Sequence, residues 1–251
     1  MPSFFSPTIQ VLLVVLLATI IRSTFGFGEA LIAVPLLALS LPITIAAPLA
    51  VLLSITIAGV VVVQDWRKIH ARSAIWLLAP SFAGIPLGIA LLASAHQALV
   101  KVALAIVIIA FSGYFLLARK PPELQGDGRV WVIGCGFLAG VLGGAYGMNG
   151  PPLAIYGAMK RWSPQHFRAT LQGYFLPASA VTMAGYWLSG LWIPAVTHYY
   201  LLSLFVAIPA TFLGRALNHR LKTEAFVKWI HAGLVCIGIL LLIQAILQRR
   251  V

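Results

Sequence analysis

Apolar runs of about the length that crosses a lipid bilayer recur along the whole chain. A membrane-spanning helix needs about 20 predominantly apolar residues, and roughly eight to ten such runs are present, separated by short polar stretches. The 251 residues include 61% hydrophobic and only 9% charged side chains, whereas a soluble domain carries about 25% charged residues. The sequence therefore predicts an all-α polytopic membrane protein. It excludes a soluble enzyme or binding domain, because few residues remain for one.

The apolar runs form two sets, separated by a polar stretch at residues 119–129 whose prolines and glycines break any helix. The first set is 8–21, 30–41, 44–63, 74–93 and 99–118, and the second is 130–146, 152–159, 169–188, 193–213 and 225–247. We therefore divide the chain into a first transmembrane repeat (1–118), a cytoplasmic linker (119–129) and a second transmembrane repeat (130–251). In each set the second run is too short for a core of about 30 Å.

The two sets also resemble each other in sequence. Thr56-Ile57-Ala58-Gly59 recurs as Thr182-Met183-Ala184-Gly185, and Phe25-Gly26 recurs earlier in the second half as Tyr146-Gly147. An internal duplication explains matches that keep their order. Each half crosses the bilayer three times if its short segment is re-entrant, and five times if it spans. Either number is odd, so the second copy is inverted in the membrane, as in many secondary transporters.

The net charge of +12 lies mainly in short loops. Clusters of basic residues occur at Arg67, Lys68 and Arg72, at Lys160, Arg161 and Arg168, and at Arg215, Arg220 and Lys222. In the inverted-repeat model these loops share one side, which the positive-inside rule makes cytoplasmic, and the loop 189–198, without Lys or Arg, lies outside. The basic charge is therefore interpreted as a signal for topology, and no nucleic acid is expected as a partner.

Each short helix is preceded by a glycine-rich break. The first break reads Phe25-Gly26-Phe27-Gly28-Glu29, and the second reads Tyr146-Gly147-Met148-Asn149-Gly150-Pro151. The first N–H groups of a helix have no intrahelical partner and lie at its positive end, so two helices that begin near the midplane suit an anion. The alternative is that glycines only allow close packing, the role we assign to Gly84, Gly88, Gly136, Gly140 and Gly144.

Polar side chains near the breaks complete the candidate substrate site. Glu29 is the only acid within an apolar stretch, so it is a candidate for proton coupling; alternatively it stabilises its helix or pairs with Arg22. The predicted site comprises Arg22, Gly26, Gly28, Glu29, Tyr146, Gly147, Asn149, Gly150, Pro151 and Gln172. We expect no cofactor and no metal, because the histidines and the two cysteines do not form ligand clusters.

The paired aromatic-Gly breaks, each followed by a short apolar helix in a small basic membrane protein, resemble the sulfite exporter TauE/SafE family over essentially the whole chain. The resemblance implies a multi-pass secondary transporter of the cell inner membrane, which exports small sulfur-containing anions such as sulfite or organosulfonates. Lipid, the anion and protons are then its partners, and the protein is not an enzyme. Two alternatives remain: a membrane-embedded enzyme with Glu29 as its acid or base, and a passive anion channel.

Overall fold

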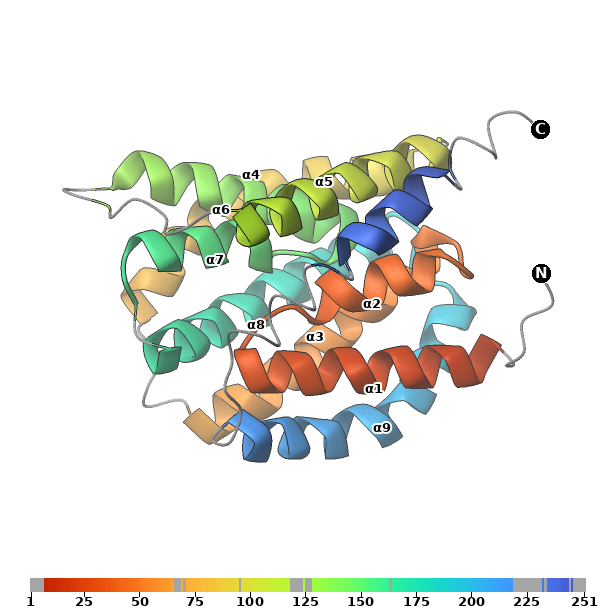
Figure 1. Ribbon diagram of the computed structural model, residues 1–251, viewed down its shortest axis with the longest axis horizontal. Helices are drawn as coiled ribbons and strands as arrows, with labels where there is room; N and C mark the ends of the chain where they lie inside the picture. The colour runs from red at the N-terminus through yellow and green to blue at the C-terminus, as the bar shows by residue number, and fades with distance from the viewer. Residues whose placement is uncertain are drawn as a thin grey trace.

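The computed structural model describes residues 7–65, 69, 71–94, 96–117, 124, 128–162, 164–218, 232, 234–243 and 245. These residues form helices and short connections, with no strand among them, which confirms the predicted all-helical fold. The helices are α1 (Pro7–Phe25), α2 (Glu29–Ala38), α3 (Ile43–Asp65), α4 (Ala71–Ala93), α5 (Gln97–Leu117), α6 (Arg129–Tyr146), α7 (Gly150–Met159), α8 (Pro164–Leu188) and α9 (Pro194–Asn218) (Figure 1). A short apolar helix, Leu234–Ile243, follows.

Five of the described helices, α1, α3, α4, α6 and α9, are long and apolar enough to cross a membrane. Their outward surface is also apolar, as the exposed side chains of Leu13, Trp76, Leu138 and Phe205 illustrate. Such a surface is stable against lipid and is rare on a soluble protein. The chain is therefore a multi-pass membrane protein. Within the last predicted segment, 225–247, the structure describes residues 232, 234–243 and 245.

The two short helices are present as predicted. α2 and α7 have 10 residues each, about 15 Å of helix, which is half the bilayer core. The helix before each one ends in the same way: Gly26 (φ 87°) donates its N–H to Arg22 O at 2.6 Å, and Gly147 (φ 68°) donates to Gly143 O at 2.8 Å. Glycine adopts this left-handed conformation without the penalty that a Cβ brings.

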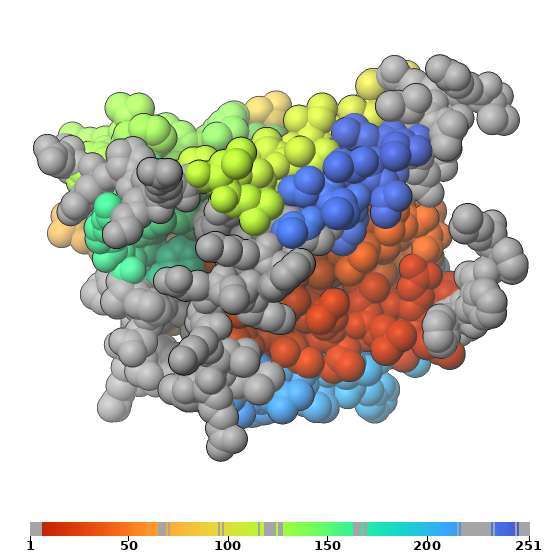
Figure 2. Space-filling view, in the orientation of Figure 1, coloured from red at the N-terminus to blue at the C-terminus, as the bar shows by residue number. Residues whose placement is uncertain are grey.

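Helices of the first half of the chain pack mainly against helices of the second half. α4 of the first half packs along α6 of the second, α1 packs along α9, and α3 and α8 pack against each other; Figure 2 shows the atoms of α1 and α9 in contact. The closest approaches also correspond: a Cβ added to Gly88 would overlap Val141 O, and one added to Gly214 would overlap Ile20 O. A two-fold relation between the halves would produce this pattern. That the halves are inverted in the membrane stays a prediction.

Glycines on both sides bring the backbones of α4 and α6 into direct contact. A Cβ on Gly84, Gly136, Gly140 or Gly144 would overlap backbone atoms of the facing helix. Ser81 uses the short distance to donate from Oγ to Gly136 O at 2.6 Å. Close packing of this kind replaces the hydrophobic effect, which is weak between helices in lipid. The packing role that the sequence predicts for these glycines is confirmed.

We expect Gly140→Ala to lower thermal stability in detergent by about 1 to 3 kcal/mol, because the new Cβ meets Ser81 backbone atoms and forces α4 and α6 apart. Gly134→Ala on the same helix is the control: nothing lies within 4 Å of its added Cβ, so it is expected to be neutral or slightly stabilising. Equal melting temperatures for the two variants would contradict this account of the interface.

The connections between helices gather at two opposite ends. In Figure 1 the start of α4 and the α7–α8 connection lie at the left, whereas the α2–α3 and α8–α9 turns lie at the right. The basic residues Arg129, Lys160 and Arg161 belong to the left end; an added Cβ on Gly128, next to Arg129, would lie 3.3 Å from Lys160 Nζ. The start of α6 and the end of α7 thus lie at the same end of the molecule. Arg67, Lys68, Arg220 and Lys222 of the predicted basic loops lie outside the described residues, and the cytoplasmic location of these loops stays a prediction.

Cysteine labelling in intact cells tests this sidedness. With Cys135 and Cys236 replaced, single cysteines at the exposed positions Ala71 and Arg161 should resist an impermeant reagent, and one at the exposed Ser189 should react. All three should react after the membrane is permeabilised, which controls for accessibility. Reaction of Ala71 and Arg161 from opposite sides of the membrane would refute the inverted-repeat topology.

Candidate functional site

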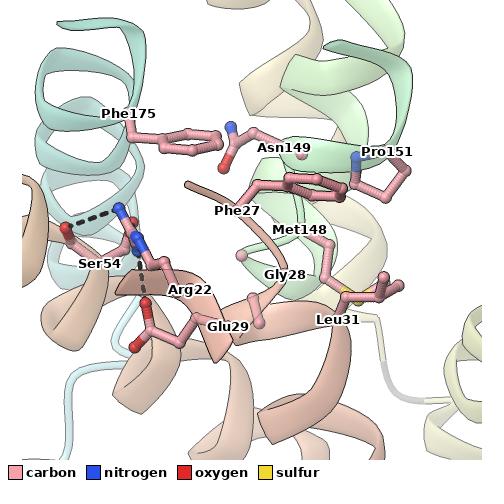
Figure 3. A pocket seen from close by; sticks show the side chains of 13 residues that line it. Arg22, Phe27, Gly28, Glu29, Leu31, Ser54, Met148, Asn149, Pro151 and Phe175 are labelled. Atoms are coloured by element: carbon pink, nitrogen blue, oxygen red, sulfur yellow. Dashed lines mark hydrogen bonds and ion pairs between the residues drawn. The ribbon is translucent and has the colours of Figure 1, made fainter. Parts of the chain in front are cut away.

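The two helix breaks meet at one small cavity inside the bundle. Residues 27–31 of the first break and 147–151 of the second line it, together with Arg22 from α1, Ser54 from α3 and Phe175 from α8 (Figure 3). The free space is about 20 Å³, enough for one water molecule. The structure thus brings together segments that are more than a hundred residues apart in the chain.

Arg22 is the charged centre of this cavity. It lies in the last turn of α1, where a cation complements the helix dipole, and only 3% of its surface is exposed. Its Nη1 donates to Glu29 Oε2 and, at 2.9 Å, to Ser54 Oγ. Its guanidinium carbon lies 5.0 Å from the centre of the Phe175 ring, a cation–π distance. A charge buried this deeply needs such partners, because water cannot solvate it.

An amide links Arg22 to the first break. Gln172 on α8 accepts from Arg22 Nη2 at 3.0 Å through Oε1 and donates from Nε2 to Gly26 O at 2.7 Å. On the other side, Ser179 of α8 donates to Ser54 Oγ at 3.1 Å. These bonds fix the guanidinium between α1, α3 and α8, and they connect its position to the backbone of the break.

Two polar side-chain atoms that face this cavity have no hydrogen-bond partner among the described residues. They are Arg22 Nε and Glu29 Oε1, and both are buried. Buried polar groups in folded proteins are almost always hydrogen-bonded, so each unpaired group is expected to serve a ligand or solvent. One is a charged donor, whose charge is opposite to that of an anion, and the other is a charged acceptor.

The two helix beginnings differ in how many N–H groups they offer. At the start of α2, Glu29, Ala30 and Leu31 all line the cavity, and the first N–H groups of a helix lack intrahelical partners. α7 begins at Gly150 with Pro151 and Pro152 next, and proline has no N–H. Anion binding by backbone is therefore expected mainly at α2.

Most of the predicted site residues line this cavity or its wall. Arg22, Gly28, Glu29, Gly147, Asn149, Gly150 and Pro151 line it, and Gln172 and Gly26 are bonded to each other beside it. The amide of Asn149 donates to Ala139 O at 3.3 Å. Tyr146 is not among the lining residues, and its hydroxyl donates to Val100 O on α5 at 3.0 Å. Their roles in binding stay predictions.

Sequence reasoning missed six residues that line the cavity: Ala30 and Leu31, which directly follow the predicted Glu29, and Phe27, Ser54, Met148 and Phe175. Ala30 and Leu31 belong to the first turn of α2. Phe27 and Met148 hold corresponding places in the two breaks, and Ser54 is a polar residue inside an apolar run; these features could have drawn attention to all three. Phe27 lies over the start of α7, so a Cβ on Gly150 would be 3.2 Å from its ring, and its ring also contacts Phe167. Phe175 gave no signal, because an aromatic residue in an apolar helix is ordinary.

Comparison with known proteins agrees with this architecture. The family model for the sulfite exporter TauE/SafE matches residues 11–242. The chain is also similar to a protein of Cupriavidus necator named probable sulfite/organosulfonate exporter TauE, with 30% identity over 186 residues, which are 72% of this chain and 70% of that protein. No solved structure matches the chain significantly. The match over nearly the whole length shows that this chain belongs to the sulfite exporter TauE/SafE family.

Proposed function

We propose that this protein is a secondary transporter of the cell inner membrane that exports small sulfur-containing anions such as sulfite or organosulfonates. The observation that supports this most strongly is the buried Arg22, which lines a cavity at the start of a half-length helix. The family and the relative's name agree with export of such anions. In this proposal the cavity between the two breaks is the substrate site.

The chemistry of the cavity suits a compact oxyanion. Sulfite and sulfonate groups carry several acceptor oxygens around one sulfur atom, and a guanidinium binds such groups with paired charge-assisted hydrogen bonds. The N–H groups at the start of α2 add donors and a positive partial charge. Because the surroundings are apolar, each of these interactions is stronger than it would be in water.

An enzyme that uses Glu29 as its acid or base fits the site less well. Among the described residues, the polar side chains converge on Arg22: Ser54 and Gln172 both accept from its guanidinium. Glu29 has only Arg22 as a hydrogen-bond partner, and its second oxygen has none. A general base would be expected to have a positioned substrate group or a second titratable group beside it. The arrangement favours binding of an anion.

The breaks themselves are tested by backbone substitution. Gly26→Val and Gly147→Val place a β-branched residue at positive φ (87° and 68°), where each Cβ costs about 1 to 2 kcal/mol and shifts the N–H groups that follow. Both variants should lose sulfite binding, measured by calorimetry, while still purifying as single species. Gly190→Val is the matched control, because Gly190 has a φ of 69° in the α8–α9 turn, far along the chain from the breaks. Equal sulfite affinity in all three would contradict the proposed site.

Glu29 is the proposed coupling residue. In proteoliposomes, an imposed pH gradient should change the rate of sulfonate transport by the wild type and not by Glu29→Gln, because the carboxamide keeps the shape of the side chain but cannot take up a proton. Asp65→Asn, at the end of α3 and about 16 Å along that helix from Ser54, is the control that loses a different acid. A Glu29→Gln variant that still responds to the gradient would assign coupling to another group.

A further inference from the structure

Arg22 cannot bind a transported anion while it keeps its present partners. A guanidinium has five N–H groups, and four of them donate to Glu29, Gln172 and the side chain and backbone of Ser54. The remaining space of about 20 Å³ holds a water molecule and not an oxyanion. Binding therefore requires that one of the present partners leave the guanidinium.

Glu29 is the partner that must leave. Ser54 and Gln172 are neutral, so they can stay bonded to Arg22 beside a bound anion. The carboxylate of Glu29 carries the same charge as the incoming anion and uses the same kind of oxygen to accept from the guanidinium. Two anionic groups around one buried cation would leave a net negative charge without water, which is strongly unfavourable.

Once displaced, Glu29 needs a proton. α2 packs against α1, α3 and α5. The described titratable residues of these three helices are Arg22 on α1, Asp65 at the end of α3, and Lys101 and Tyr114 on α5. Arg22 is the charged partner of Glu29. A carboxylate that loses this partner inside the bundle is stable only when neutral. Its Oε1 atom makes no hydrogen bond, so it can accept the proton without breaking one.

We propose that Glu29 is a tethered competitor that occupies the position of the transported anion on Arg22, so that the anion and one proton bind together. The proton comes from solvent and is added to Glu29 Oε1, and the Nη1 hydrogen bond that Oε2 releases is taken over by an oxygen of the anion. The net charge of the site is zero before and after. The proposal rests on the anion site proposed above. It adds that the anion displaces Glu29 from Arg22 and that a proton binds to Glu29 in the same event.

The test measures binding of methanesulfonate, which stays fully ionised from about pH 5 to about pH 8, so that only the protein titrates. Because binding consumes a proton, wild-type affinity should rise as the pH falls, by up to about tenfold per pH unit, the limit for one linked proton. Glu29→Gln should bind at least about tenfold more tightly than the wild type at pH 8, because a neutral amide competes weakly. Its affinity should not depend on pH.

A weakly buffered titration with an indicator dye gives an independent readout. Wild type should take up close to one proton for each anion bound, and Glu29→Gln should take up none. Asp65→Asn should match the wild type in affinity and proton uptake, because Asp65 is the last residue of α3, about 16 Å along that helix from Ser54. If Glu29→Gln does not fold, Glu29→Asp replaces it in the test. Because the aspartate side chain is shorter, its ion pair with Arg22 should be weaker, so the affinity for methanesulfonate should rise while its pH dependence remains.

Two outcomes would overturn the inference and a third would overturn its basis. Weaker binding in Glu29→Gln, or an unchanged pH dependence, would show that Glu29 does not compete for Arg22. Methanesulfonate binding that survives in Arg22→Gln at wild-type affinity would instead refute the anion site itself. The Arg22 variant therefore separates failure of the proposed function from failure of the competition.

Discussion

The site is built around a single positive charge in a place where water cannot solvate it. Arg22 is 3% exposed, and the cost of its burial is offset by an ion pair, by neutral acceptors on two other helices and by an aromatic ring. These partners come from α2, α3 and α8, so the guanidinium fixes the relative positions of α1, α2, α3 and α8. The same need for compensation is the reason for proposing that an anion can take the place of Glu29 on Arg22.

The helices that hold this charge are supported by interfaces of a different kind. α4 and α6 touch through glycines and leave no room for a Cβ, and α1 and α9 repeat that contact at Gly214. Such interfaces resist sliding, because any shift brings backbone atoms into overlap. The short helices α2 and α7 instead begin just after glycines that have a positive φ. The structure therefore combines closely packed long helices with two short helices whose beginnings lie at the site.

The sequence was sufficient for the all-helical fold and for the two breaks that line the cavity, because both depend on local patterns. Apolar run length predicts the helices, and the Gly26 and Gly147 breaks predict where α2 and α7 begin. It could not predict which distant side chains meet Arg22. Ser54 and Gln172 reach it only through the packing of α3 and α8, and no spacing rule encodes that. The hydrogen bond from the Tyr146 hydroxyl to Val100 O could not be predicted for the same reason.

Each half contains a short helix that follows a glycine break, but the two halves differ in the charged residues at that break. By the match between Phe25-Gly26 and Tyr146-Gly147, the positions equivalent to Arg22 and Glu29 are Gly143 and Gly150. Gly143 cannot be replaced by an arginine without rearrangement, because the Asn149 amide lies where its Cβ would be, and a Cβ on Gly150 would press on Phe27. A second ion pair would also bury two more charges in one small cavity, each with its own desolvation cost. The first half therefore supplies both charges that line the cavity, and the second half supplies a close-fitting wall of uncharged residues.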